Sequence, residues 1–228
     1  MLGWGDDEAL EQVQTRRSGP LTVAVAGRPG AGSSTMAAAL RTCFRLCCMT
    51  IGDTDPPPTA DLLIRVIGAQ VREQDRRALA DVAVPTIVVA AKADVRSDPR
   101  ALADAAADDL GRSVHPVSGL LASAAVGPAD LVGLRAADPP APLLRRYGLT
   151  GVAAARELLD RLPESTAREV TERLRAVSGI DALADPIRER SGPVATLRDR
   201  RLRDDLRLLA ARGVARDDAE RALVGFAS

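Results

Sequence analysis

The stretch LTVAVAGRPGAGSSTMAAAL, residues 21–40, decides the fold of this chain. It begins with an apolar, β-branched run that ends at Gly27, continues through a glycine-rich turn, and enters an alanine-rich segment with high helix propensity. A strand, a glycine-rich loop and a helix in this order predict a loop that wraps phosphate. The glycines let successive backbone N–H groups point into one cavity, where the positive end of the helix dipole adds to the attraction.

The loop lacks the lysine that its spacing calls for. Residues 27–34 follow the pattern G-x-x-x-x-G-K-[S/T] with Ser33 in the lysine position. Because that lysine offsets charge on the β- and γ-phosphates as the bond breaks, its loss should weaken hydrolysis more than binding. Arg28 is the nearest cation, but a planar guanidinium is not equivalent to an ammonium. The alternative is a glycine-rich turn that binds nothing. The expected phosphate contacts are Gly27, Gly30, Ala31, Gly32, Ser33, Ser34 and Thr35, and the hydroxyl of Ser34 is a candidate ligand for Mg²⁺.

The composition sets the class of protein. The chain has 228 residues, of which 46% are apolar, enough for a substantial core. Basic and acidic residues number 31 each, so no overall charge favours nucleic acid. No apolar run is long enough to span a membrane, and the start of the chain lacks a signal sequence, so a cytoplasmic protein is expected. Peripheral membrane contact has no support in the sequence, and the three cysteines within residues 43–48 lack a nearby histidine for a zinc site.

Apolar strands alternate with helical segments up to residue 119, which predicts an α/β fold. We expect strands at 21–27, 46–53, 62–68, 85–91 and 113–119, with helices at 33–45, 70–82 and 98–111. Because the strands are apolar on both faces, a mostly parallel sheet of about five strands, of the P-loop NTPase type, is predicted. Later residues are helix-periodic, with breaks at Pro163, Gly179, Gly192 and Gly213. The predicted parts are a flexible arm (1–20) with room for one short helix around residues 8–13, the α/β domain (21–134), a proline-rich linker (135–148) and an all-helical C-terminal domain (149–228).

A second motif follows the strand at 85–91. Of the 31 basic residues only Lys92 is a lysine, and it stands in the sequence AKAD, residues 91–94. This sequence resembles the NKxD element of the GTPase superfamily, with Ala91 in place of the asparagine. The resemblance implies that Asp94 accepts hydrogen bonds from guanine and that Lys92 lays its alkyl stem along the base. The sequence HPVSGLLA (115–122) resembles the loop that reaches guanine O6, which implies backbone contacts from Ser118 and Gly119.

Residues 60–95 as a whole resemble translation-factor-like and dynamin-like GTPases, and the helical tail resembles that of bacterial dynamin-like GTPases. The family resemblance implies GTP or GDP with Mg²⁺, for which Asp53 is the candidate metal-side carboxylate. The chain departs from the pattern at the P-loop lysine and at Ala91. It also lacks the switch I threonine, and its sequence DTDP (53–56) replaces D-x-x-G. These losses predict a degenerate GTPase.

We therefore expect a guanine-nucleotide-binding protein with little or no hydrolysis that acts as a regulatory or interaction partner; a related intact GTPase is one candidate partner. The alternatives are a slow GTP hydrolase that relies on Arg28 and Ser34, and a pseudo-GTPase scaffold that binds protein without nucleotide. His115 has no paired carboxylate at a useful spacing, so acyl transfer is not favoured. The arginine-rich run 198–205 is interleaved with aspartates, which indicates a salt-bridged helix face rather than a nucleic-acid patch.

Overall fold

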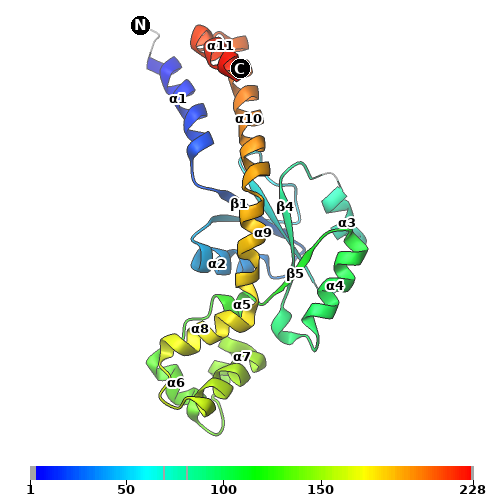
Figure 1. Ribbon diagram of the computed structural model, residues 1–228, viewed down its shortest axis with the longest axis vertical. Coiled ribbons are helices and arrows are strands. Elements are labelled where there is room, and N and C mark those ends of the chain that lie inside the picture. Colours follow the sequence, from blue (N-terminus) through cyan, green and yellow to red (C-terminus); the bar gives the residue numbers. More distant parts are fainter. Residues whose placement is uncertain (1–3, 69, 81, 227–228) are drawn as a thin grey trace. The chain divides into compact units, whose positions relative to one another are not determined.

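The computed structural model describes residues 4–68, 70–80 and 82–226. These residues form two compact units, which are treated separately below. The larger unit comprises Thr22–Glu189, and the smaller one combines Met1–Leu21 with Arg190–Ser228. Figure 1 labels most helices and strands of both units.

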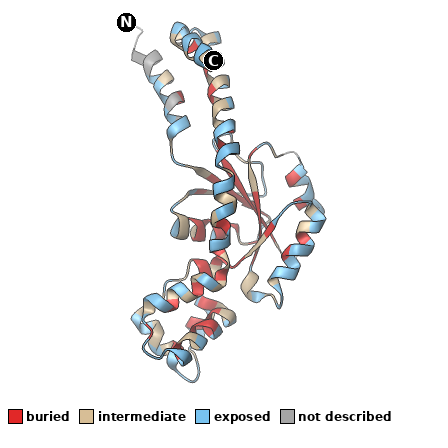
Figure 2. Ribbon diagram, viewed as in Figure 1, coloured by how far each residue is buried: buried red, intermediate tan, exposed pale blue. Residues whose placement is uncertain are grey.

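A five-stranded, all-parallel sheet forms the centre of the larger unit. Its order is β2-β1-β3-β4-β5. The prediction of an α/β fold with a parallel sheet and a helical C-terminal region is therefore confirmed. The interior strands are almost wholly buried (Figure 2). The strands are β1 (Thr22–Gly27), β2 (Cys47–Gly52), β3 (Leu62–Ile67), β4 (Thr86–Ala91) and β5 (Val114–Val117).

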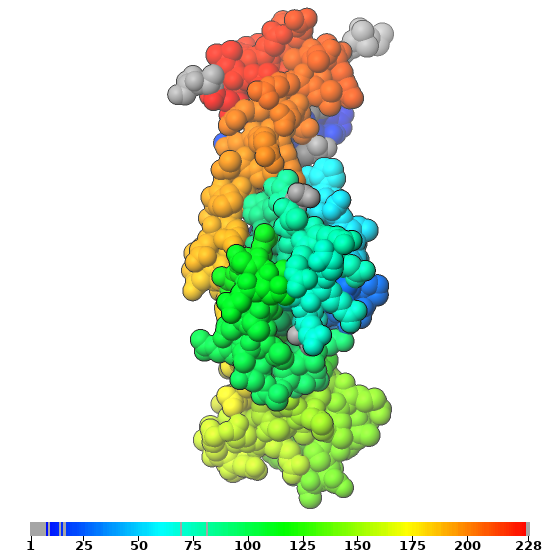
Figure 3. Space-filling model, turned by 90° about the vertical axis from the view of Figure 1, so that its right-hand side faces the viewer, coloured from blue at the N-terminus to red at the C-terminus, as the bar shows by residue number. Residues whose placement is uncertain are grey.

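Helices cover both faces of the sheet. The chain runs from β1 outward to β2, then crosses to β3 and continues outward in the opposite direction. Because parallel crossovers are right-handed, this reversal places α2 (Ser33–Phe44) on one face and α3 (Glu73–Ala80) and α4 (Pro99–Leu110) on the other (Figure 1). In Figure 3 the side chains of α3 and α4, coloured turquoise to green, cover the face turned to the viewer. A short 3₁₀ helix, η1 (Ala93–Val95), follows β4.

Strand β2 differs from the expectation of a buried strand. Only Cys48 is buried in this strand, and its other positions are exposed or half-buried. The reason is its place at the edge of the sheet, where it pairs with β1 alone. His115 lies inside β5, opposite Val89.

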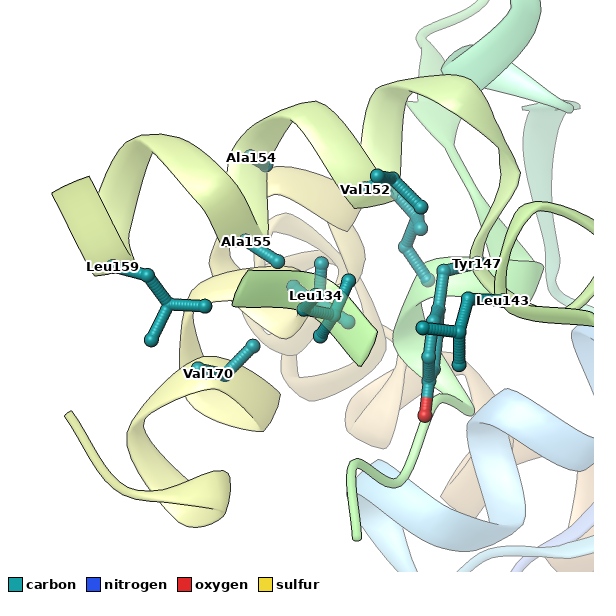
Figure 4. Packing of buried hydrophobic residues seen from close by; sticks show 10 residues of the cluster. Leu134, Leu143, Tyr147, Val152, Ala154, Ala155, Leu159 and Val170 are labelled. Carbon is teal, nitrogen blue, oxygen red and sulfur yellow. The ribbon is translucent and has the colours of Figure 1, made fainter. Parts of the chain in front are cut away.

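A second core lies among the helices that follow β5. Leu134, Tyr147 and Val170 come from α6, α7 and α8 and meet there (Figure 4). Residues 141–148, expected as part of a linker, lie in α7, because Leu143 and Tyr147 are buried in this core. Gly148 interrupts the helical geometry of α7 with φ 68°. The elements are α5 (Gly119–Ala122), α6 (Pro128–Arg135), α7 (Ala141–Arg161), α8 (Ala167–Ser178), η2 (Ile180–Leu183) and α9 (Ala184–Glu189).

The smaller unit contains helices α1 (Trp4–Ser18), α10 (Ser191–Arg212) and α11 (Arg216–Gly225). The stretch expected as a flexible arm thus contains a helix, which packs on α10 through Val13, Leu202 and Leu206. Arg198 in α10 donates hydrogen bonds to the carbonyl oxygens of Arg17, Gly19 and Pro20. Gly192, where a break was expected, lies in the first turn of α10. Within the described ranges, no helix combines the length and apolar character needed to cross a membrane.

Candidate functional site

A pocket of about 290 Å³ opens at the carboxyl ends of β1, β3 and β4. The chain leaves β1 toward one edge of the sheet and leaves β3 toward the other, so the loops that follow these neighbouring strands diverge. In parallel α/β sheets, ligands bind in the crevice that such a reversal creates. The pocket is lined by Arg28, Pro29, Gly30, Ala31, Gly68, Gln70, Arg72, Lys92 and Arg96.

The glycine-rich loop has the backbone geometry that its sequence predicts. Gly30 and Gly32 have φ angles of 78° and 105°, a region that side chains with a Cβ rarely adopt. The N–H of Ala31 donates to the carbonyl oxygen of Arg28 at 2.9 Å, which closes a tight turn with Pro29 and Gly30 at its centre. The loop then enters α2, with Gly32 as its N-cap residue.

The first turn of α2 presents backbone donors. The N-cap residue is a glycine and so has no side chain to cap the helix, and the first amide of this turn to find a backbone acceptor is that of Met36, which donates to Gly32 at 2.9 Å. For the amides of Ser33, Ser34 and Thr35 the described part of the chain supplies no acceptor. These donors, at the positive end of the helix dipole, are suited to an anion.

Ser33, in the lysine position, faces the strand beneath the loop. It is 8% exposed, and its hydroxyl has no hydrogen-bond partner among the described residues. A Cβ placed on Gly27 would lie 2.7 Å from the Ser33 hydroxyl and 2.6 Å from the carbonyl oxygen of Val66, so only glycine fits at position 27. The side chain that replaces the lysine is therefore packed beside β1 and adds no charge to the pocket.

Arg28 is held by a buried ionic network. Its guanidinium lies 3.2 Å from a carboxylate oxygen of Asp75, which is fully buried at the start of α3. Asp75 also pairs with Arg65 at 3.2 Å and accepts the backbone N–H of Arg72 at 3.1 Å. Arg65, in the middle of β3, is itself only 2% exposed. Because the Asp75 carboxylate accepts all three donors, it fixes Arg28 at the side of the pocket.

Lys92 also lies at this pocket, as an exposed residue directly after β4. Its φ and ψ angles are 60° and 39°, in the left-handed region that costs a residue with a side chain of order 1 kcal/mol. Strained backbone of this kind is concentrated at binding sites. The structure thus places Lys92 at the same pocket as residues 28–31 of the glycine-rich loop.

The other base-reading residues lie outside the pocket lining. A Cβ on Gly148 would lie 3.6 Å from the carboxylate of Asp94, so the interruption in α7 lies beside this side chain. The hydroxyl of Thr150 donates to the backbone carbonyl of Asp94. The N–H of Ser118 donates to the carbonyl oxygen of Ser178 at 2.8 Å, and is therefore already paired within the protein.

Gly119 packs against α2, where a Cβ would lie 3.2 Å from the backbone nitrogen of Met36. The hydroxyl of Ser118 accepts the N–H of Leu121 at 3.2 Å and caps the short helix α5. Ser118 and Gly119, which follow β5, therefore make their contacts with the helices α5 and α2.

The residues proposed for Mg²⁺ do not fit that ion. Asp53 forms an ion pair with Arg65, so its charge is already balanced, and the pocket lining carries four cationic side chains and no carboxylate. Ser34 offers one exposed hydroxyl. In the parts of the chain that are described, no three His, Cys, Asp or Glu side chains are grouped to hold a metal ion.

Arg72, Arg96 and the Arg65–Asp75 pair did not emerge from the sequence patterns. Arg65 carried a usable signal, because it is the one charged residue in the apolar run LLIRVIG and a buried arginine requires a carboxylate partner. Arg72 and Arg96 reach the pocket from the loops after β3 and β4, which only the strand order brings together.

No known family model matches this sequence, and no curated protein emerges as a relative.

Proposed function

We propose that this chain is a degenerate GTPase-like protein that binds a guanine nucleotide through its phosphates, hydrolyses it little or not at all, and acts through a protein partner. One observation carries the proposal: the pocket over the glycine-rich loop is lined by four cationic side chains, and the helix that follows this loop has unpaired amides in its first turn, at Ser33, Ser34 and Thr35, which lie outside the pocket lining. Both kinds of group attract phosphate oxygens. We expect low hydrolytic activity because Ser33 stands in the lysine position, and the transferred phosphate therefore lacks the lysine that stabilises its transition state.

The guanine part of the proposal rests on the resemblance of the AKAD sequence and on the place of Lys92 at the pocket. Titration calorimetry with GDP, GTP and ADP tests it. We expect both guanine nucleotides to bind, and Lys92→Met to weaken GDP binding about threefold to tenfold through loss of one charged contact. Arg100→Ala, an exposed substitution outside the pocket, is the control. Absence of binding heat at millimolar nucleotide would refute nucleotide binding. Equal affinity for ADP and GDP would refute a preference for guanine.

A scaffold without nucleotide is the second candidate, and the base-reading side favours it. The N–H of Ser118 is already bonded to Ser178, and Asp94 lies beside Gly148 rather than at the pocket. Under this alternative, Lys92→Ala and Asp94→Ala leave the melting temperature in GTP unchanged. Slow hydrolysis would instead appear as phosphate release above that of a Ser34→Ala control.

A further inference from the structure

All the charged residues that line the pocket over the glycine-rich loop are positive. Arg28, Arg72, Lys92 and Arg96 contribute four cations, and the remaining lining residues are uncharged. A pocket with one sign of charge concentrates ligands of the opposite sign and repels ions of its own sign.

Three of these cations have no ion-pair partner within residues 4–68, 70–80 and 82–226. Arg28 is balanced by Asp75, which leaves Arg72, Lys92 and Arg96 uncompensated. The Nε of Arg96 is buried and makes no hydrogen bond to the described residues. Arginines without an ion pair also occur elsewhere in the larger unit, but Arg72, Lys92 and Arg96 differ from them because all three line one pocket. Their charges therefore add up at a single place that an anionic ligand can occupy.

This charge distribution is unfavourable for a divalent cation. Mg²⁺ in a phosphate-binding site depends on oxygen ligands and on nearby negative charge. Here Asp53 already balances Arg65, and a Mg²⁺–nucleotide complex would bring two positive charges toward three unpaired ones. Guanidinium groups, in contrast, bind phosphate oxygens through two parallel N–H donors and need no metal.

We propose that this pocket binds the diphosphate group of its nucleotide without a divalent cation, and that Arg72, Lys92 and Arg96 together supply the charge that a P-loop lysine and Mg²⁺ supply in an intact loop. The proposal rests on the nucleotide binding proposed above and specifies the ionic form of the ligand. Because a terminal phosphate carries about −1.5 to −2 charges at neutral pH, the metal-free diphosphate matches the unpaired cations better than its Mg²⁺ complex does.

Titration calorimetry of the full chain with GDP and with inorganic pyrophosphate, each in EDTA and in millimolar Mg²⁺, tests the proposal. We expect both ligands to bind at least as tightly in EDTA as in Mg²⁺, and binding to weaken as NaCl is raised. Arg72→Ala and Arg96→Ala should each weaken both ligands about tenfold or more, because each removes a charge-assisted contact. Arg100→Ala is the matched control, since Arg100 is exposed and lies outside the lining.

The outcomes separate the two proposals. Binding of GDP that requires Mg²⁺ would overturn the metal-free form and leave nucleotide binding intact. Metal-free binding that Arg72→Ala and Arg96→Ala leave unchanged would overturn the assignment of these cations. Failure of both ligands to bind in either buffer would overturn both proposals, provided that thermal melting shows each variant to be folded.

Discussion

The phosphate side and the base side of the candidate site both carry sequence signals, yet their polar groups are used differently. On the phosphate side, the amides of the first turn of α2 and the cations Arg72, Lys92 and Arg96 have no partner among the described residues. On the base side, the Ser118 amide is bonded to Ser178 and Asp94 lies beside the interruption in α7. The phosphate side is thus arranged for a ligand, whereas the base side is joined to the helices of the same unit.

The difference teaches that a sequence motif and polar groups left free for a ligand are separable within one site. A backbone loop keeps its phosphate-binding geometry as long as its glycines remain, because the donors belong to the main chain. A base-reading motif depends on side chains and amides, and neighbouring helices can occupy these groups through contacts within the protein. The two sides should therefore respond differently to substitution.

The largest effect is expected at Asp75, which holds the phosphate side together. Asp75→Ala removes the acceptor shared by Arg28, Arg65 and the Arg72 amide, and leaves the buried Arg65 with Asp53 as its remaining partner. An incompletely paired buried charge costs about 3–5 kcal/mol. We expect urea unfolding to show a loss of this size.

The control for Asp75→Ala is Asp109→Ala, which breaks an exposed pair with Arg76 on the surface of α3 and α4. Exposed pairs are screened by solvent, so this substitution should change the unfolding midpoint little. Equal losses for the two variants would mean that the buried network does not organise the phosphate side.

A smaller effect is expected on the base side, at Gly179. This glycine has φ 76°, and a Cβ there would lie 2.6 Å from the carbonyl oxygen of Pro116 in β5. Gly179→Ala should therefore force α8 away from β5 and disturb the bond between Ser118 and Ser178. Gly111 is a matched control, since its φ is 62° and nothing lies within 4 Å of its Cβ position.

The comparison of the two glycine variants separates backbone strain from crowding. Gly111→Ala should cost about 1–2 kcal/mol through its left-handed backbone alone. Gly179→Ala should cost roughly 1–3 kcal/mol more, measured by urea unfolding, because overpacking adds to the strain. If the two losses were equal, the contact between η2 and β5 would not stabilise the base side.

The strands and the helices that cover the sheet were predictable because their signals are local. The run 21–27 and the alternation that follows it predict β1 through β5 to within one or two residues. The exposure of β2 was not predictable, since a strand's place at the edge depends on strand order and not on its own residues. The helix within residues 141–148 was hidden by the prolines of the preceding segment, although Leu143 and Tyr147 are four residues apart, the spacing of one helix face.

The candidate site shows the same division between residues that local sequence predicts and residues that tertiary structure brings together. The loop glycines and Lys92 were visible in the sequence because the loop and the strand end are contiguous segments. The contributions of Arg72 and Arg96 depend on the adjacency of β1, β3 and β4, and the pairing of Ser118 with Ser178 joins residues 60 positions apart. Such contacts follow from tertiary structure, for which a single sequence carries no direct signal.

The smallest effect is expected at Tyr147, in the helical core beside Gly148. Its single hydroxyl hydrogen is directed to Asp130 at 2.8 Å and shared with the carbonyl oxygen of Ala125 at 3.1 Å. When the hydroxyl is removed, Asp130 and the Ala125 carbonyl still accept hydrogen bonds from Arg146. Tyr147→Phe therefore leaves no buried group unpaired and should cost about 1 kcal/mol. Burial, with the hydrogen bond to Asp130, raises the pKa of Tyr147 to about 12.

This raised pKa predicts how stability depends on pH. Below pH 10 the phenol is neutral in both the folded and the unfolded chain, and its full contribution is present. Between pH 10 and about 12 the phenol ionises in the unfolded chain but not in the folded protein, so the free energy of unfolding falls. Burial also raises the pKa of the Cys48 thiol, to about 11, so part of the decline remains without the phenol. Tyr147→Phe should therefore show a smaller decline between pH 10 and about 12. Because Tyr147 is the only tyrosine, phenolate absorbance reports its ionisation directly. A midpoint near pH 10 in the folded protein would show that α7 does not hold this side chain in its core.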